Sequence, residues 1–456
     1  MKKHFIVFWV AVAAAASFAV PTVSNVQVTQ HPATHAVTVD YDLTEDAIVT
    51  VAFLTNGVVC EAATSVAGDV WRLVKVTGEL KKGSTTEYMS YPNRKISWDM
   101  AADLGADNVA NHSVTARVSA WTTDAPPPYY VFDLVSAHAE TRRRHYECEW
   151  QLPGGIGSDL YRTTKMVFRR IPAANQTFVM GAPATETEAA GLLNANGCGQ
   201  ETQHNVTFTR DFYIGVFEVT QAQWIQVMGS IPGESDTSGN LWSMRQHATN
   251  DAKTLPIQSC ARNRWLCGEK HAQDSWKGDV DELPGVGHPT FFYKFRQLAG
   301  DATATTKHYN LPYEAQWEFA CRAGTTTAFS DGRDYSASTD YSDIAVYDRQ
   351  QAEGPVRVGS KKPNPWGLYD MHGNMGEVVL DNVKANATGS YVDANYAADA
   401  TDPHGWEDTH FNVGVRGGSW VQGRQTLRSA YRNNGNWWGN PQFNQGFRIA
   451  VPVDEL

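Results

Sequence analysis

The chain has 456 residues, of which 42% are hydrophobic and 19% are charged, so it is long enough and apolar enough to form two or three folded domains. These proportions exclude a largely disordered protein. The formal net charge of −11 disfavours nucleic-acid binding, because proteins of that class need a basic surface to neutralise phosphates.

The first nineteen residues have the pattern of an export signal. Lys2 and Lys3 precede an apolar run over 5–16, and small residues end at Ala19, which predicts cleavage after that residue. The run is shorter than the ~20 residues that cross a bilayer, and no second run of that length follows. We therefore expect a secreted or periplasmic protein with no membrane span.

Residues 20–123 have the pattern of an all-β module. Short alternating segments at 36–41, 48–52 and 114–120 are separated by turn residues, which predicts a two-sheet antiparallel sandwich. The segment 95–99 (Lys-Ile-Ser-Trp-Asp) resembles a strand of immunoglobulin-like or fibronectin-type modules. Titratable groups do not cluster in this module, so we expect a spacer or adhesive role.

Three prolines at 126–128 mark a boundary, and we expect residues 124–163 to be a proline-rich linker and connector. The remaining residues, 164–456, predict an α+β domain with little regular secondary structure. Thr220 and Gln223 have the spacing of a capping box, which predicts a helix ending near Met228. Further helices are predicted over 291–298, capped by Thr290, and from Pro312 to Ala323.

Five blocks of this second domain follow one another in the order of a known family. They are 178–181 (Phe-Val-Met-Gly), 212–220, 311–324, 367–374 and the C-terminal frame, 415–448, which begins Val-Arg-Gly-Gly-Ser-Trp. Over about 164–451 the chain resembles the formylglycine-generating enzyme, or sulfatase-modifying factor, family. The resemblance implies a fold related to C-type lectins. It also implies family activities that include copper-dependent oxidation of a sulfatase cysteine to formylglycine.

The catalytic members carry two cysteines at positions that align with Gln422 and Leu427. A thiolate pair is the ligand type that selects Cu(I), and neither an amide nor an alkyl group replaces it. We therefore expect no catalytic residue at these positions and no formylglycine-generating activity. The iron-dependent branch takes its ligands largely from an extra helical domain, which 20–163 does not resemble. We do not expect copper or iron, although a divergent oxidase or oxygenase with other ligands stays the alternative.

The resemblance implies a structural Ca²⁺ at the fourth block. Carried over by position, its ligands are the side chains of Asp370 and Glu377 and the carbonyls of Gly373 and Met375, an oxygen set that suits a hard cation. A second site would use Asp343 and the carbonyl of Ile344. The alternative is that the two acidic residues of the first set only cap turns.

Aromatic and amide side chains surround the vacant catalytic positions and predict a binding groove. Its expected residues are Ser419, Trp420, Gln422, Arg424, Arg432, Asn434 and Trp437. The alternative is that each tryptophan fills the core, although Trp437 and Trp438 are adjacent and cannot both point inward. We expect an exported module that binds a peptide or glycan, or docks on an exported protein partner.

Overall fold

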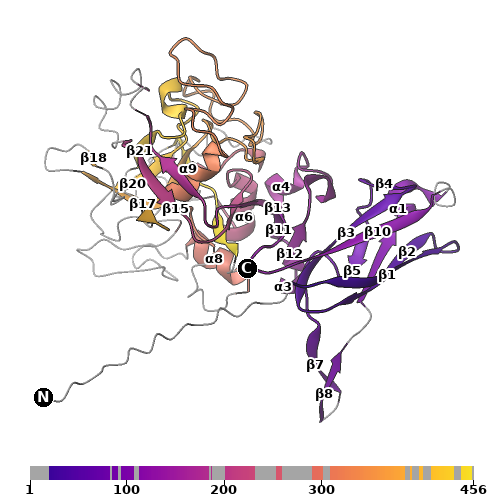
Figure 1. The fold of residues 1–456 in the computed structure, drawn as a ribbon. Coiled ribbons are helices and arrows are strands. Elements are labelled where there is room, and N and C mark those ends of the chain that lie inside the picture. The colour runs from indigo at the N-terminus through magenta and orange to yellow at the C-terminus, as the bar shows by residue number, and fades with distance from the viewer. Residues whose placement is uncertain are drawn as a thin grey trace, which may run out of the picture. The chain divides into compact units, whose positions relative to one another are not determined.

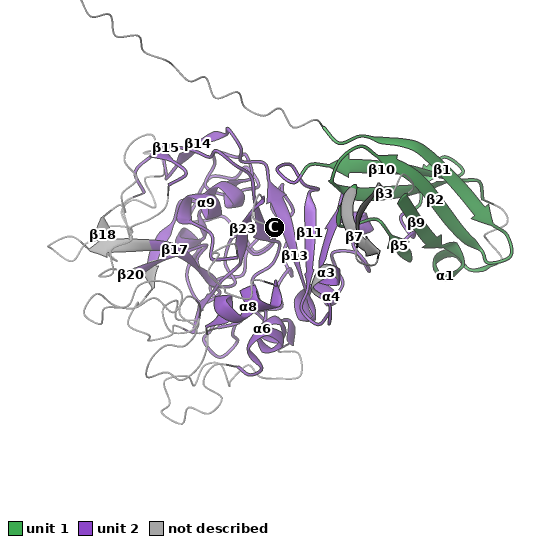
Figure 2. Ribbon diagram, turned by 90° about the horizontal axis from the view of Figure 1, so that it is seen from below, with its two compact units in different colours: residues 1–60, 65–122 green, residues 61–64, 123–456 purple. Residues whose placement is uncertain are grey.

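The computed structural model describes residues 20–82, 85–90, 94–106, 112–183, 186, 201–231, 253–258, 266, 290–300, 309–385, 391–392, 400–403, 412–435 and 443–453 (Figure 1). The expected export signal, 1–19, lies outside these residues. The chain divides into two compact units, 1–60 with 65–122 and 61–64 with 123–456 (Figure 2). None of the helices in the described ranges is long and apolar enough to cross a membrane.

The first unit contains two antiparallel sheets and a hairpin. One sheet has the order β1-β2-β9-β5, with strands Val23–His31, Ala36–Leu43, Arg94–Asp99 and Val66–Gly68. The other has the order β10-β3-β4, with β6 also pairing to β3; its strands are Val114–Trp121, Ala47–Thr55, Val58–Val59 and Leu73–Val74. The hairpin joins β7 (Thr77–Lys82) to β8 (Thr85–Ser90), and a short helix, α1 (Met100–Leu104), follows β9.

The core of the first unit follows the alternation seen in the sequence. Along β2, buried residues alternate with partly exposed ones, and Val37 and Val39 are fully buried. Phe53 of β3 and Trp98 of β9 pack with ring centroids 4.7 Å apart, so residues of both sheets share one core. The predicted strands are confirmed, while the immunoglobulin-like or fibronectin-type character of the module stays a prediction.

The largest sheet of the second unit has the order β12-β11-β13-β16-β23. Its strands are Arg143–Tyr146, Tyr129–Asp133, Lys165–Ile171, Phe212–Gly215 and Ala450–Pro452. Two of these strands, β11 and β12, come from the segment 124–163 that we expected to be a connector. Buried Tyr130 and Phe132 on β11 explain the difference, because they pack into the main core of this unit.

Two smaller sheets complete the β-structure described in the second unit. One joins β14 (Thr177–Met180), β15 (His204–Thr207) and β19 (Ala400–Thr401). The other has the order β18-β17-β20-β21, with strands Tyr391–Val392, Gly376–Ala385, Asn412–Arg416 and Arg432–Gly435. A short parallel strand, β22 (Gln445–Gly446), also pairs with β17.

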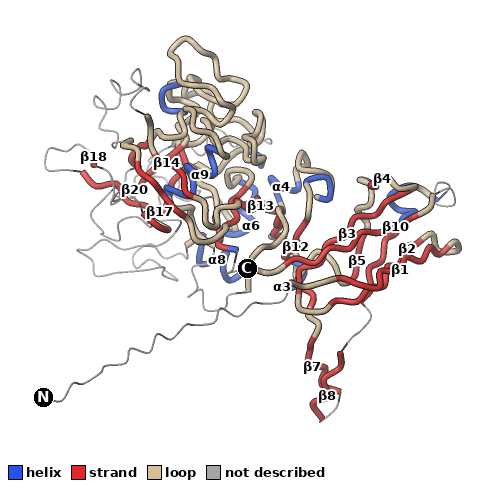
Figure 3. The backbone as a smooth tube through the Cα atoms, in the orientation of Figure 1, coloured by secondary structure: helices blue, strands red, loops and turns tan. Residues whose placement is uncertain are grey.

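The three predicted helices are present in the second unit. They are α6 (Gln221–Met228), α8 (Phe291–Leu298) and α9 (Glu314–Arg322), beside the short α3 (Ala139–Arg142) and α4 (Leu160–Thr163). Helix α9 begins after Tyr313, whose amide donates to Gln316, and ends at the left-handed residue Ala323. The prediction therefore began two residues early and ended one residue late. Much of the rest is loop (Figure 3), as expected for this domain.

Candidate functional site

The C-terminal frame is anchored to helix α9 by buried ion pairs. Arg416 of β20 binds the carboxylate of Glu318, and Arg432 of β21 binds Glu314 through Nε–Oε1 and Nη2–Oε2 contacts of 2.6 and 2.7 Å. All four side chains are almost fully buried. One partner left unpaired in such a setting costs several kcal/mol, roughly 3–5. These arginines therefore fix the frame to the helix.

Two further arginines of the frame are held in the same way. Arg428 binds Glu201 through contacts of 2.6 and 2.9 Å, and Arg448 donates from Nε to Glu377 at 2.6 Å. Arg448 also donates to the carbonyl of Gly215 in β16, which joins the frame to the largest sheet, and to the carbonyl of Tyr369. These four arginines of the C-terminal frame thus have structural roles.

At the two positions that hold cysteines in catalytic members, the side chains of this protein already make contacts within the domain. The side-chain oxygen of Gln422 accepts a hydrogen bond from the hydroxyl of Ser419 at 2.9 Å. The backbone carbonyl of Gln422 accepts from the backbone amide of Asp348 at 2.9 Å. Leu427 is fully buried in an apolar cluster that includes Phe329 and Tyr341. Neither group supplies the soft ligand that Cu(I) needs.

A cysteine does lie close to this region, but it is a buried thiol. Cys321 of α9 lies 3.5 Å from the hydroxyl of Ser429 and 3.9 Å from Nε2 of His372. Burial raises the pKa of the Cys321 thiol to about 12, so the thiol stays protonated near neutral pH.

The residues expected to hold calcium come together in one acidic cluster with Glu218. Burial, followed by the charge of Asp370, raises the pKa of Glu218 well above its usual value, and burial raises the pKa of Asp370 to about 6. Both oxygens of Glu218 are engaged, by the side chain of Asn374 and the amide of Met375. Glu218 and Asp370 therefore keep their protons more readily than exposed carboxyl groups do.

Individually, the expected calcium ligands fit a cation unequally. Asp370 fits, because Oδ2 accepts from the amide of Gly359 while Oδ1 is buried with no hydrogen-bond partner among the described residues. Glu377 does not, because its oxygens accept from Arg448 and from the indole of Trp317. Gly373 lies where a Cβ would meet the Val346 carbonyl at 2.3 Å, so its loop is tightly placed. Calcium binding here stays a prediction.

The second expected calcium site lies apart, near the surface. Asp343 is exposed and forms ion pairs with Arg333 at 2.7 Å and Lys362 at 3.4 Å, while Ile344 is buried. These two cations lower the pKa of Asp343 despite partial burial. More broadly, the described residues contain no group of three or more His, Cys, Asp or Glu side chains placed to hold a metal ion.

Residues expected to line a groove lie at different depths. Ser419, Trp420 and Arg432 are buried, and Trp420 packs against Val346 and Met375. Gln422 and Arg424 are partly exposed. Asn434 belongs to β21, but its side chain lies outside the described residues, and so does Trp437. The frame thus presents Arg424 to solvent and uses Trp420 for packing.

Arg424 lines a hollow of about 620 Å³. This hollow, which we call the Arg424 hollow, is lined by Ser342, Ala345, Val346, Tyr347, Asp348, Arg349, Val356, Ser360, Lys361 and Arg424. It is tied directly to the frame, because the amide of Arg349 donates to the Trp420 carbonyl at 2.8 Å. Its volume is within the ~300–1,000 Å³ typical of ligand sites.

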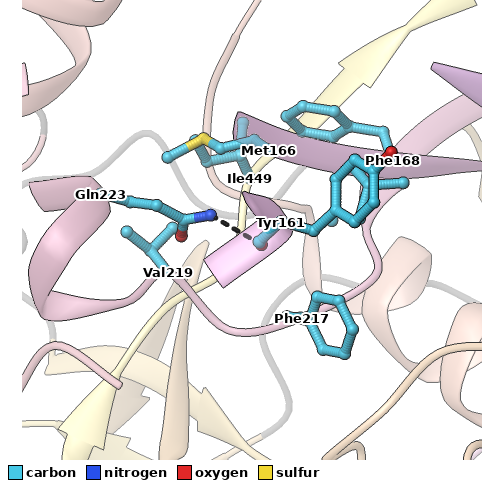
Figure 4. A pocket seen from close by; sticks show the side chains of 9 residues that line it. Tyr161, Met166, Phe168, Phe217, Val219, Gln223 and Ile449 are labelled. Atoms are coloured by element: carbon cyan, nitrogen blue, oxygen red, sulfur yellow. Dashed lines mark hydrogen bonds between the residues drawn. The ribbon is translucent and has the colours of Figure 1, made fainter. Parts of the chain in front are cut away.

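A second cavity lies in the core and is far smaller. Residues that line it include Tyr161, Phe217 and Gln223 (Figure 4), and its volume is about 10 Å³. The side-chain nitrogen of Gln223 donates to the carbonyls of Tyr161 and Lys165, which leaves little polar capacity unused. A space of this size holds about one water molecule, so this cavity is not a ligand site.

Comparison with known proteins places this geometry in a family. The family described as the sulfatase-modifying factor enzyme 1-like domain matches residues 170–453, more than half of the chain. The chain belongs to this family. The expected resemblance is therefore confirmed, and the α+β, sheet-rich architecture of the second unit is consistent with it.

Individual relatives of this sulfatase-modifying-factor domain are distant. The formylglycine-generating enzyme of Bos taurus is 25% identical over 262 residues, which cover 54% of this chain and 64% of that protein. The chaperone protein LppX of Paenibacillus barcinonensis is 27% identical over 194 residues, covering 38% of this chain and 62% of that protein. The chain thus spans less than two thirds of either relative. Among solved structures, Treponema denticola variable protein 1 has a TM-score of 0.43 at 20% identity, covering 63% of this chain and 95% of that one.

Sequence reasoning missed three residues of the sulfatase-modifying-factor domain that the structure makes prominent. Glu218 has a signal in the sequence, because a carboxylate between Phe217 and Val219 in an apolar run indicates a buried, partnered charge. Arg349 and Lys361 have no such signal. Surface cations are common, and only the folded loop brings these two to the Arg424 hollow.

Proposed function

We propose that this protein is a non-catalytic member of the sulfatase-modifying-factor family that docks a peptide segment of an exported protein in the Arg424 hollow. The observation that carries the proposal is the position of the hollow. It adjoins the frame that bears the catalytic cysteines in other members, while Gln422 and Leu427 occupy the cysteine positions here.

The contacts that Gln422 and Leu427 make at the two cysteine positions support the non-catalytic part of the proposal. Gln422 is bonded to Ser419, and Leu427 completes an apolar cluster, so each replacement serves packing or local hydrogen bonding. The buried ion pairs of Arg416 and Arg432 keep the frame in place without metal chemistry. The frame is retained while the metal-binding cysteines are replaced, which suits a protein that binds a partner without catalysing the family's reaction.

The composition of the hollow supports a peptide as the ligand. Ala345, Val346 and Val356 provide apolar lining for side chains, and Ser342 and Ser360 add exposed hydroxyls. Sugars are commonly held against exposed aromatic faces. Because Tyr347 is the single aromatic residue among the described residues of this lining, the composition favours a peptide over a sugar. That one relative is named a chaperone protein is in keeping with docking on another protein. We further propose that the protein is exported and that the first unit acts as a spacer.

A blocked hollow tests this proposal. Ser360 lines the hollow and is exposed, so Ser360→Trp fills space there without breaking a buried contact. Ser24 is also exposed but belongs to strand β1 of the first unit, which makes Ser24→Trp the matched control. On an array of varied peptides, the full chain and Ser24→Trp should bind a shared set that Ser360→Trp loses. Absence of bound peptides, or equal binding by all three proteins, contradicts the proposal.

A further inference from the structure

The Arg424 hollow has a charge opposite to that of the whole chain. Three cationic side chains, Arg349, Lys361 and Arg424, line it together with one carboxylate, Asp348. The chain as a whole has a formal net charge of −11. A local excess of positive charge on an acidic protein attracts an anionic ligand.

The positive charges of the hollow are weakly neutralised by the protein. Lys361 is half-buried, and within the described ranges its ammonium group has neither a hydrogen bond nor an ion pair. Arg424 donates from Nη1 to the carbonyls of Ala337 and Thr339 at 2.8 and 3.0 Å, which positions the guanidinium. Its charge interacts with that of Asp340, but within the described residues Arg424 forms no ion pair.

The guanidinium of Arg349 also has hydrogen-bond donors that a ligand could use. Its contact to Glu353 is loose, at 3.8 Å between nitrogen and oxygen, and its Nε is buried without a hydrogen-bond partner among the described residues. The backbone of Arg349 is nevertheless fixed, because its amide is bonded to the Trp420 carbonyl. A guanidinium on a fixed backbone with unused donors is suited to a carboxylate.

Apolar lining accompanies these cations and is itself anchored to the core. Val346 and Val356 belong to the cluster that packs around Trp420, so one side of the hollow continues into the core of the domain. A ligand that matches both features carries carboxylates and apolar side chains together. Short acidic segments of proteins have this composition, whereas acidic glycans lack the apolar side chains.

We propose that the Arg424 hollow binds a carboxylate-rich peptide segment, whose acidic side chains pair with Arg349, Lys361 and Arg424. This inference rests on the proposed function and gives it a ligand class. The apolar side chains of the segment contact Val346 and Val356. Binding is electrostatic in part, so it weakens as salt rises from ~0.05 to ~0.5 M.

The test compares two labelled peptides that differ in charge only, one with alternating glutamate and valine and one with glutamine in place of glutamate. Fluorescence anisotropy with the full chain should show tighter binding of the glutamate peptide. Lys361→Gln should weaken that binding by roughly three- to tenfold, as expected for loss of one charge pair. Lys362→Gln is the matched control, because Lys362 is exposed, pairs with Asp343 and does not line the hollow.

The outcomes separate this inference from the proposed function. Equal binding of both peptides, blocked by Ser360→Trp, overturns the acidic ligand class and leaves peptide docking intact. Binding of neither peptide, or equal effects of Lys361→Gln and Lys362→Gln, overturns the inference. A sulfated polysaccharide that binds and depends on Lys361, where the glutamate peptide does not bind, assigns the hollow to a glycan and also overturns it.

Discussion

Arg432 and Glu314 are joined by two hydrogen bonds inside the second unit, with Nε–Oε1 and Nη2–Oε2 distances of 2.6 and 2.7 Å. Glu314 is the first residue of helix α9, and Arg432 is the first residue of strand β21. The pair therefore joins two segments that are 118 residues apart in the sequence. Such a contact is structural, although sequence reasoning assigned Arg432 to a groove.

The first prediction concerns this pair. Arg432→Met leaves the Glu314 carboxylate buried with Arg416, at 3.6 Å, as its remaining ion-pair partner among the described residues, and should lower the free energy of unfolding by about 3–5 kcal/mol. Urea unfolding followed by circular dichroism measures the change. Lys362→Met removes the exposed pair with Asp343 and should cost less than about 1 kcal/mol. Similar losses for the two variants would contradict a structural role for Arg432.

A second prediction concerns pH and His145. Burial, followed by the charges of Arg143 and Arg144, lowers the pKa of His145 to about 3. The unfolded chain then takes up a proton near pH 6.5 that the folded chain excludes, so stability is lost as the pH falls from about 6.5 to about 3, by up to ~1.4 kcal/mol per pH unit.

The variant His145→Phe isolates this contribution. The ring of His145 packs against Tyr130 and Tyr213, with centroids 5.1 and 6.3 Å away, so phenylalanine keeps the aromatic packing and removes the titration. Unfolding free energies measured from pH 7 to pH 4 should fall less steeply for the variant than for the wild type. Parallel slopes would show that His145 does not contribute to the acid sensitivity.

A third prediction separates backbone conformation from steric crowding in the family block 367–374. Gly373 has φ +83°, and an added Cβ would lie 2.3 Å from the Val346 carbonyl oxygen. Gly332 has a similar φ of +88° with nothing within 4 Å of the added Cβ. Gly332→Ala should cost roughly 1–2 kcal/mol, the conformational cost alone. Gly373→Ala should cost clearly more in the same thermal unfolding assay, and equal costs would contradict the close approach.

The calcium site gives a fourth prediction. Oδ1 of Asp370 is a buried carboxylate oxygen with no hydrogen-bond partner among the described residues, so a bound cation would contact it. Calcium added after chelation should raise the melting temperature of the wild type. At a hundredfold excess over Kd, the expected stabilisation is about 2.7 kcal/mol. Asp370→Asn should abolish the rise in melting temperature, and a smaller rise for Asp343→Asn would show binding at the second site. A wild type that does not respond to calcium would contradict the prediction.

The local features of the fold were predictable from the sequence, because they depend on neighbouring residues. The side chain of Thr220 accepts from the backbone amide of Gln223, and the side chain of Gln223 accepts from the backbone amide of Thr220. Four consecutive residues therefore determine where α6 begins. The same holds for the Thr290 cap and for the alternation along β2. By contrast, β11 pairs with β13 more than thirty residues later, and nothing local to Tyr130 indicates that partner.

The site was predictable only in part, for a similar reason. The replaced cysteine positions were visible from the family frame, and the structure accounts for Gln422 and Leu427 by contacts to Ser419 and Phe329. Burial of Arg432 was not visible, because arginine is usually exposed and its partner Glu314 is distant in sequence. The cations of the Arg424 hollow come together only when the loop 342–361 folds against the frame.

The most direct test of the central claim is mass spectrometry of a cysteine-containing sulfatase peptide after incubation with the full chain, copper and oxygen. The Bos taurus formylglycine-generating enzyme serves as the positive control. With Gln422 and Leu427 in place of the thiolate pair, we expect the peptide cysteine to stay unchanged, at the level of a reaction without protein. Formation of formylglycine above that level would contradict the claim that this member of the family binds without catalysing its reaction.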